Sequence, residues 1–146
     1  MLIQDEIVHK VAKVLDQIII ENTESLLKGD FYVYPGFGWG FYLNLPIGEF
    51  GLKSLIHHIL FETEIYKKIL TQKQYDQCIN IKYEKPGENY YPNDGSEEDK
   101  KLDDILMWVY FRCVVFVAHR LVTLGIDVKD YFEEFEDIDF TKESGL

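Results

Sequence analysis

Residues 96–125 read SEEDKKLDDILMWVYFRCVVFVAHRLVTLG, and this stretch decides the fold. Ser96 stands three residues before Asp99, which is typical of a helix start because a hydroxyl and a carboxylate at this spacing can bond free backbone N–H groups. The closing glycine suits a helix end, since glycine readily adopts the left-handed conformation found there. Residues 105–118 are apolar at all but one position. The sequence therefore predicts a buried central helix near 97–124, whose centre, residues 105–118, is enclosed on all sides.

The pattern changes several times upstream of this helix. Apolar residues recur at spacings of three and four from Ile3 to Ile18, which predicts an amphipathic helix. Aromatic and branched residues on either side of a glycine-rich turn predict a β-hairpin near 31–45. Helical spacing returns over 51–70, and residues 78–83 alternate polar with apolar as a candidate third strand.

The length of the chain suits one domain. A chain of 146 residues can bury a self-sufficient core, and no internal repeat divides it. We expect a single α+β domain over 1–146, in which a small antiparallel sheet packs on helices. Residues 136–146 are expected to form a mobile acidic C-terminal tail.

The composition of the chain limits the classes of function that it can have. The chain has 26 acidic and 15 basic residues, a net charge of −11, so it is a poor candidate for binding nucleic acid. The N-terminus lacks the features of a secretory signal. The longest apolar stretch is shorter than the roughly 20 residues that span a bilayer. Cys78 and Cys113 have no CxxC spacing. We therefore expect a cytoplasmic protein with reduced thiols and no membrane partner.

Known catalytic patterns are poorly matched. The glycines of residues 36–40 are followed by a predicted strand, whereas phosphate-binding loops need a helix there. No GxSxG elbow is present. His57, His58 and Glu62 form the best metal candidate, but adjacent histidines on a helix point about 100° apart and cannot both reach one ion. The favoured interpretation is a surface histidine beside an acid, with no metal, no cofactor and no enzyme activity.

Arg112 interrupts the apolar run of the central helix. A buried guanidinium needs a carboxylate or carbonyl partner, because an unpaired buried charge is costly. A structural ion pair, or a side chain that reaches out to solvent, is the favoured interpretation. A ligand-anchoring arginine is the alternative.

The acidic excess is confined to two segments. Residues 84–104 hold eight acids against three lysines, and residues 127–146 hold eight against two, while the rest of the chain is balanced. Concentrated negative charge steers a basic partner, although it also serves solubility. Aromatic side chains accompany these acids, as in tight protein interfaces. The predicted partner-binding residues are Tyr90, Tyr91, Asp94, Glu97, Glu98, Asp130, Tyr131, Phe132, Glu133, Glu134 and Trp39.

In general character the chain resembles the immunity proteins that bacteria make against polymorphic and contact-dependent-inhibition toxins. It shares their small size, acidity, abundance of Tyr and Phe, and freedom from catalytic signatures. The resemblance implies inhibition of a cognate toxin, expected to be basic and in many cases a nuclease, by direct contact. Two alternatives stay open: a small metal-dependent enzyme that uses the region of His57, His58 and Glu62, and an acidic regulator that mimics nucleic acid.

Overall fold

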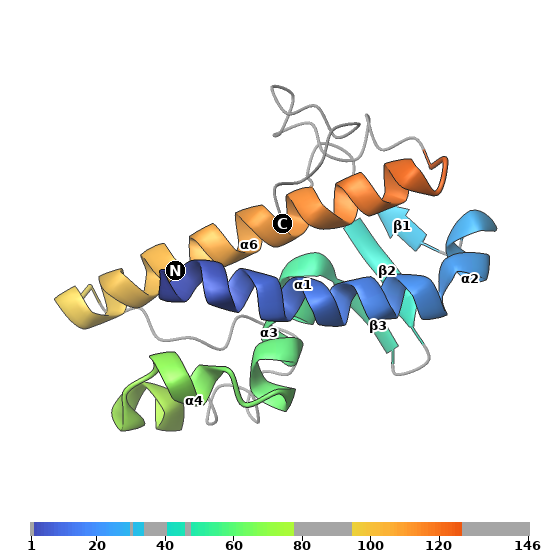
Figure 1. Ribbon diagram of the computed structural model, residues 1–146. Helices are drawn as coiled ribbons and strands as arrows, with labels where there is room; N and C mark the ends of the chain where they lie inside the picture. Colours follow the sequence, from blue (N-terminus) through green and yellow to red (C-terminus); the bar gives the residue numbers. More distant parts are fainter. Residues whose placement is uncertain (1, 30, 34–40, 46–47, 78–94, 127–146) are drawn as a thin grey trace.

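Two long helices lie side by side and organise the fold (Figure 1). They are α1, Ile3–Glu21, and α6, Glu97–Thr123. The computed structural model describes residues 2–29, 31–33, 41–45, 48–77 and 95–126.

Two polar contacts join α1 to α6. The indole Nε1 of Trp108 donates to Asp5 Oδ1 at 3.0 Å. Further along, Arg120 Nε lies 2.9 Å from Asp16 Oδ1 in an ion pair. From the first contact to the second, the residue number rises from 5 to 16 on α1 and from 108 to 120 on α6. The two helices therefore run parallel.

The predicted ends of α6 are confirmed. Ser96 is the N-cap, and its hydroxyl accepts from the Asp99 backbone N–H at 3.2 Å. At the other end Gly125 has a φ of +84°, a left-handed conformation that suits glycine. The backbone N–H of Ile126 bonds the Leu121 carbonyl at 3.0 Å across this turn. The local signals at Ser96 and Gly125 therefore mark where α6 begins and ends.

The apolar stripe of α1 faces the core as its spacing predicts. Ile7, Val11 and Leu15 are buried, whereas Ile3, at the start of the stripe, is 43% exposed. The helix continues to Glu21 and is followed by the short α2, Thr23–Leu27.

The remaining described helices complete the core. They are α3, Leu52–Glu62, then α4, Tyr66–Ile69, and a short helix over residues 72–77. Buried side chains of α3 join those of α1 and α6 in one apolar cluster. Figure 1 shows α3 behind α1, with α4 below it.

Three short strands form an antiparallel sheet in the order β1-β2-β3. Strands β1, Phe31–Val33, and β2, Phe41–Leu45, occupy the stretches that the sequence places in a hairpin. Strand β3, Gly48–Gly51, pairs with β2 and leads directly into α3.

The expected α+β architecture is wrong, because helices dominate the described part of the chain. Helices α1, α3 and α6 have 19, 11 and 27 residues, whereas the three strands have only 3, 5 and 4. The fold is therefore helical in its organisation, with the small sheet attached at one end. The strand predicted at 78–83 and the tail predicted at 136–146 lie outside the described residues. The third strand of the described sheet is Gly48–Gly51 instead.

The expectation that the centre of α6 is enclosed on all sides is also wrong. Met107 is 42% exposed and Trp108 is 39% exposed, although both lie within the apolar run. By length and apolar composition α6 passes the test for a membrane-spanning helix, the one helix in the described part of the chain that does. A buried core helix passes the same test, and much of α6 is buried inside the protein, so this match is weak.

Neighbouring positions on α6 offer a matched test of this packing. Leu106 is fully buried, so Leu106→Ala should lower the free energy of unfolding by about 2–5 kcal/mol through lost apolar contact and the cavity left behind. Met107→Ala, one residue along on the exposed side, should change it by about 0.5 kcal/mol or less. Urea denaturation measures both, and similar losses for the two variants would contradict the orientation of α6 described above.

Candidate interaction surface

The first turn of α6 presents two carboxylates to solvent. Glu97 and Glu98 are exposed, whereas Asp99 is 4% exposed and turned inward. The Asp99 Oδ1 atom accepts from Gln74 Nε2 at 2.8 Å, and Gln74 is itself buried in the helix over residues 72–77. The Ser96 cap and this buried contact hold the turn from two sides. Glu97 and Glu98 therefore project from a fixed piece of backbone.

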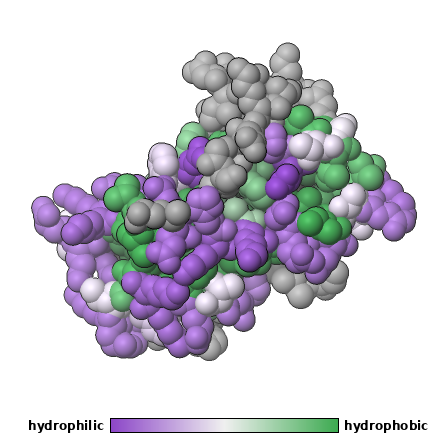
Figure 2. Space-filling view, viewed as in Figure 1, coloured by the Kyte–Doolittle hydropathy of each residue, from purple (hydrophilic) through white to green (hydrophobic). Residues whose placement is uncertain are grey.

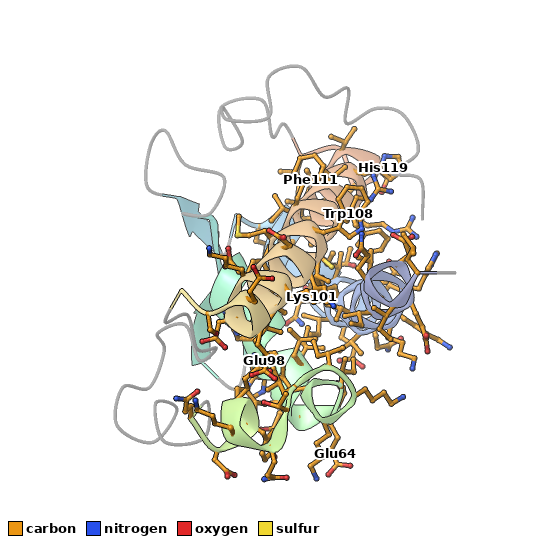
Figure 3. All side chains as sticks on the ribbon, turned by 90° about the vertical axis from the view of Figure 1, so that its left-hand side faces the viewer. Glu64, Glu98, Lys101, Trp108, Phe111 and His119 are labelled. Atoms are coloured by element: carbon orange, nitrogen blue, oxygen red, sulfur yellow. The ribbon has the colours of Figure 1, made fainter. Side chains whose placement is uncertain are left out.

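These two glutamates are the predicted partner-binding residues that the structure places. The others lie outside the described residues: Tyr90, Tyr91, Asp94, Asp130, Tyr131, Phe132, Glu133, Glu134 and Trp39. Glu97 and Glu98 are adjacent in sequence, so they would be close together in any fold. What the structure adds is their exposure at the near end of α6 in the view of Figure 3.

An exposed aromatic residue that the sequence analysis missed lies further along α6. Figure 3 labels Trp108 and Phe111 further along this helix than Glu98 and Lys101, and the ring centroids of Trp108 and Phe111 are 6.4 Å apart. The Arg112 guanidinium carbon lies 5.7 Å from the centroid of the Trp108 ring. Arg112 thus has an aromatic contact. The alternative prediction, that Arg112 anchors a ligand, is not tested by the structure. A helical stripe through Glu97, Lys101, Asp104 and Trp108 was the available signal, because these positions recur at spacings of three and four.

His57 lies in a buried polar cluster with two tyrosines. Its Nδ1 atom is 2.5 Å from the Tyr66 hydroxyl, and its Nε2 atom bonds the Tyr110 hydroxyl. All three side chains are fully buried and come from α3, α4 and α6. A neutral imidazole has one donor and one acceptor nitrogen, so one phenol can donate to it and the other can accept from it. The cluster ties three helices together.

This arrangement bears on the metal candidate. Both ring nitrogens of His57 face phenol oxygens, His58 is half-buried and Glu62 is exposed. Within the described ranges, no three or more His, Cys, Asp or Glu side chains come together as a metal ion would require. The described geometry gives the metal-dependent alternative no positive support.

Cys113 is a free thiol in the core of α6. Burial raises the pKa of this thiol to about 12, because the thiolate is poorly solvated there, while the charge of Arg112 acts in the opposite direction. Since the thiolate is the nucleophilic form, Cys113 is inert at neutral pH.

Exposed ion pairs lie on α1 and at the start of α4. A hydrogen bond from Lys10 lowers the pKa of Glu6, and their atoms Nζ and Oε1 are 3.0 Å apart. Lys67 lowers the pKa of Glu64 in the same way, and this contact raises the pKa of Lys67. Glu64 has a φ of +59° in the turn between α3 and α4. These pairs are exposed to solvent, where such contacts contribute little to stability.

No protein-family model, no curated protein and no solved structure matches the chain. The function is therefore proposed from the chemistry of the residues themselves.

Removing one phenol oxygen tests the buried cluster. Tyr110→Phe should lower the free energy of unfolding by about 1–3 kcal/mol, because a ring nitrogen of His57 loses a hydrogen-bond partner inside the core. Tyr75→Phe is the matched control, since Tyr75 is only half-buried, and it should cost about 0.5 kcal/mol or less. Equal costs in chemical denaturation would show that the contact with His57 adds nothing.

The Cys113 thiol gives a second test, made in a Cys78→Ser background so that one thiol remains. Ellman's reagent at pH 8 should label Cys113 only when urea unfolds the protein. The unfolded thiol loses its proton from about pH 9, whereas the folded thiol holds it to about 12, so stability should fall as pH rises between these values.

Adding Cys113→Ala to this background supplies the control. The variant has no thiol to titrate, so its stability should fall less steeply over the same alkaline range. Rapid labelling of native Cys113, or identical pH profiles for the two proteins, would contradict the buried thiol.

Proposed function

We propose that this chain is an inhibitory binding protein, an immunity protein that neutralises a basic toxin domain by direct contact. The observation that carries the proposal is the confinement of the acidic excess to residues 84–104 and 127–146. The first of these segments includes the exposed Glu97 and Glu98 at the start of α6. The resemblance to immunity proteins in size, acidity and aromatic content points the same way.

Electrostatics supplies the physical mechanism. Carboxylates gathered on one part of a surface raise the rate at which a basic protein meets it in the correct orientation. A turn that is already held by the Ser96 cap and the Asp99–Gln74 contact needs little reordering when the partner arrives. The toxin would be inhibited because the bound chain covers its active site or a neighbouring surface.

Co-expression is the first test. Each candidate toxin domain encoded in the same gene cluster is expressed in an indicator bacterium with and without this chain, and viable cells are counted. Protection together with a complex on size-exclusion chromatography is the expected result. If the chain protects against none of these domains, the proposal is contradicted.

Binding kinetics test the role of the α6 turn. Glu97→Lys combined with Glu98→Lys should slow association with the toxin domain by about threefold to tenfold at low salt, because the steering charge is reversed. The effect should fade in 1 M salt, where the screening length is about 3 Å compared with about 10 Å at 0.1 M. Surface-binding measurements at both salt concentrations give the two association rates.

A matched control changes the net charge equally at another place. Glu21 ends α1, about 27 Å along the helix from its start, and Glu24 lies in the following helix α2; both are exposed. Glu21→Lys with Glu24→Lys should slow association much less than the α6 pair. Equal slowing by both pairs would mean that only total charge matters and that the α6 turn has no special part.

A further inference from the structure

Trp108 is exposed and yet held in place. Its side chain contacts two helices, because the indole N–H donates to Asp5 on α1 while Phe111 and Arg112 approach the ring from α6. Despite these contacts the residue is 39% exposed. Figure 3 shows Trp108 on α6 beyond Lys101.

An exposed side chain that is already ordered is a good binding anchor. A partner that covers a freely rotating side chain must also order it, and that entropy cost is subtracted from the affinity. Asp5, Phe111 and Arg112 order the Trp108 ring before any partner arrives. Tryptophan also offers a large apolar area and a ring face that attracts cations, and it is enriched among residues that dominate binding energy.

The surroundings of Trp108 resemble the centre of an interface. Met107 beside it is 42% exposed and adds apolar area, and Figure 2 shows hydrophobic atoms among hydrophilic ones near the start of α1. Glu97 lies three turns before Trp108 on the same face, about 16 Å away along the axis. At helical spacing the α6 charges that share the face of Trp108 are Glu97, Lys101, Asp104 and Arg112, and Asp5 of α1 bonds the indole, so three carboxylates stand against two bases.

We propose that Trp108 is the central anchor for the basic partner, with Met107 beside it and the acids of α6 around it. The inference rests on the proposed function and names the residue that holds the complex together. The partner covers the exposed part of the indole, and its cations meet Asp104 and Glu97. The charge balance favours this occupant, because the carboxylates outnumber the bases around the ring.

The first measurement needs no partner. In a Trp39→Phe variant Trp108 is the sole tryptophan, and its time-resolved fluorescence anisotropy should decay with the tumbling of the whole protein. Adding Asp5→Ala should introduce a fast local component, while Asp5→Asn, which keeps an acceptor oxygen, should largely restore the slow decay. A large fast component in the Trp39→Phe protein itself would overturn the inference.

The second measurement uses a toxin domain that the chain protects against. Trp108→Ala should raise the dissociation rate by tenfold or more and leave the association rate within about twofold, because a desolvated anchor acts after the encounter. Trp108→Phe keeps a ring and should fall between wild type and Trp108→Ala, and thermal denaturation should show both variants folded. Leu27→Ala is the control, an exposed apolar residue on α2 that should leave both rates unchanged.

The outcomes separate the two proposals. If wild type binds and protects but Trp108→Ala dissociates at the wild-type rate, the anchor is wrong and the proposed function stands. If wild type forms no complex, the proposed function fails and the anchor fails with it.

Discussion

Burial of one side of α6 against α1 is the constraint on which the rest of the structure depends. Val109, Cys113 and Leu121 of α6 are fully buried in the apolar cluster that this helix shares with α1. Each large aliphatic side chain removed from water contributes about 1.5–3 kcal/mol, and interdigitation of these side chains sets how far one helix slides along the other. The Asp5–Trp108 and Asp16–Arg120 contacts form at that same offset at the edge of the seam between the two helices.

Short elements are held by buried polar contacts. Helix α4 has only four residues and would not form alone, since the first helical turn costs more than it gains. Tyr66 connects it to α3 through His57, and Gln74 connects the next short helix to the start of α6 through Asp99. A buried polar group that loses its hydrogen-bond partner lowers the stability of the fold. Each of these contacts therefore restricts the short helix that carries it to one position. The inner polar groups thereby position the backbone that carries Glu97 and Glu98.

The predictable parts of this chain are those in which neighbours in sequence decide the structure. Ser96 and the final glycine of the helix mark its ends, and the apolar spacing of α1 marks its buried face. The exposure of Met107 cannot be predicted, because an apolar run does not show which side another helix will cover, whereas that of Trp108 is indicated only by the stripe of Glu97, Lys101 and Asp104 before it. The partners of His57 are 9 and 53 residues away, beyond any local pattern. Strand β3 has glycine at both ends, a poor β-forming composition, and it forms beside β2 because tertiary context outweighs propensity.

The parallel course of α1 and α6 has an electrostatic consequence of its own. Peptide dipoles leave about half a positive elementary charge at a helix N-terminus, and two parallel helices add these charges where antiparallel ones would cancel them. Both positive ends lie toward the same side of the molecule, on the left in Figure 1. The first turns there carry Asp5 and Glu6 on α1 and Glu97, Glu98 and Asp99 on α6. Acidic side chains at this end thus offset a field that the backbone itself creates, and part of the negative surface is an internal requirement of the helix arrangement.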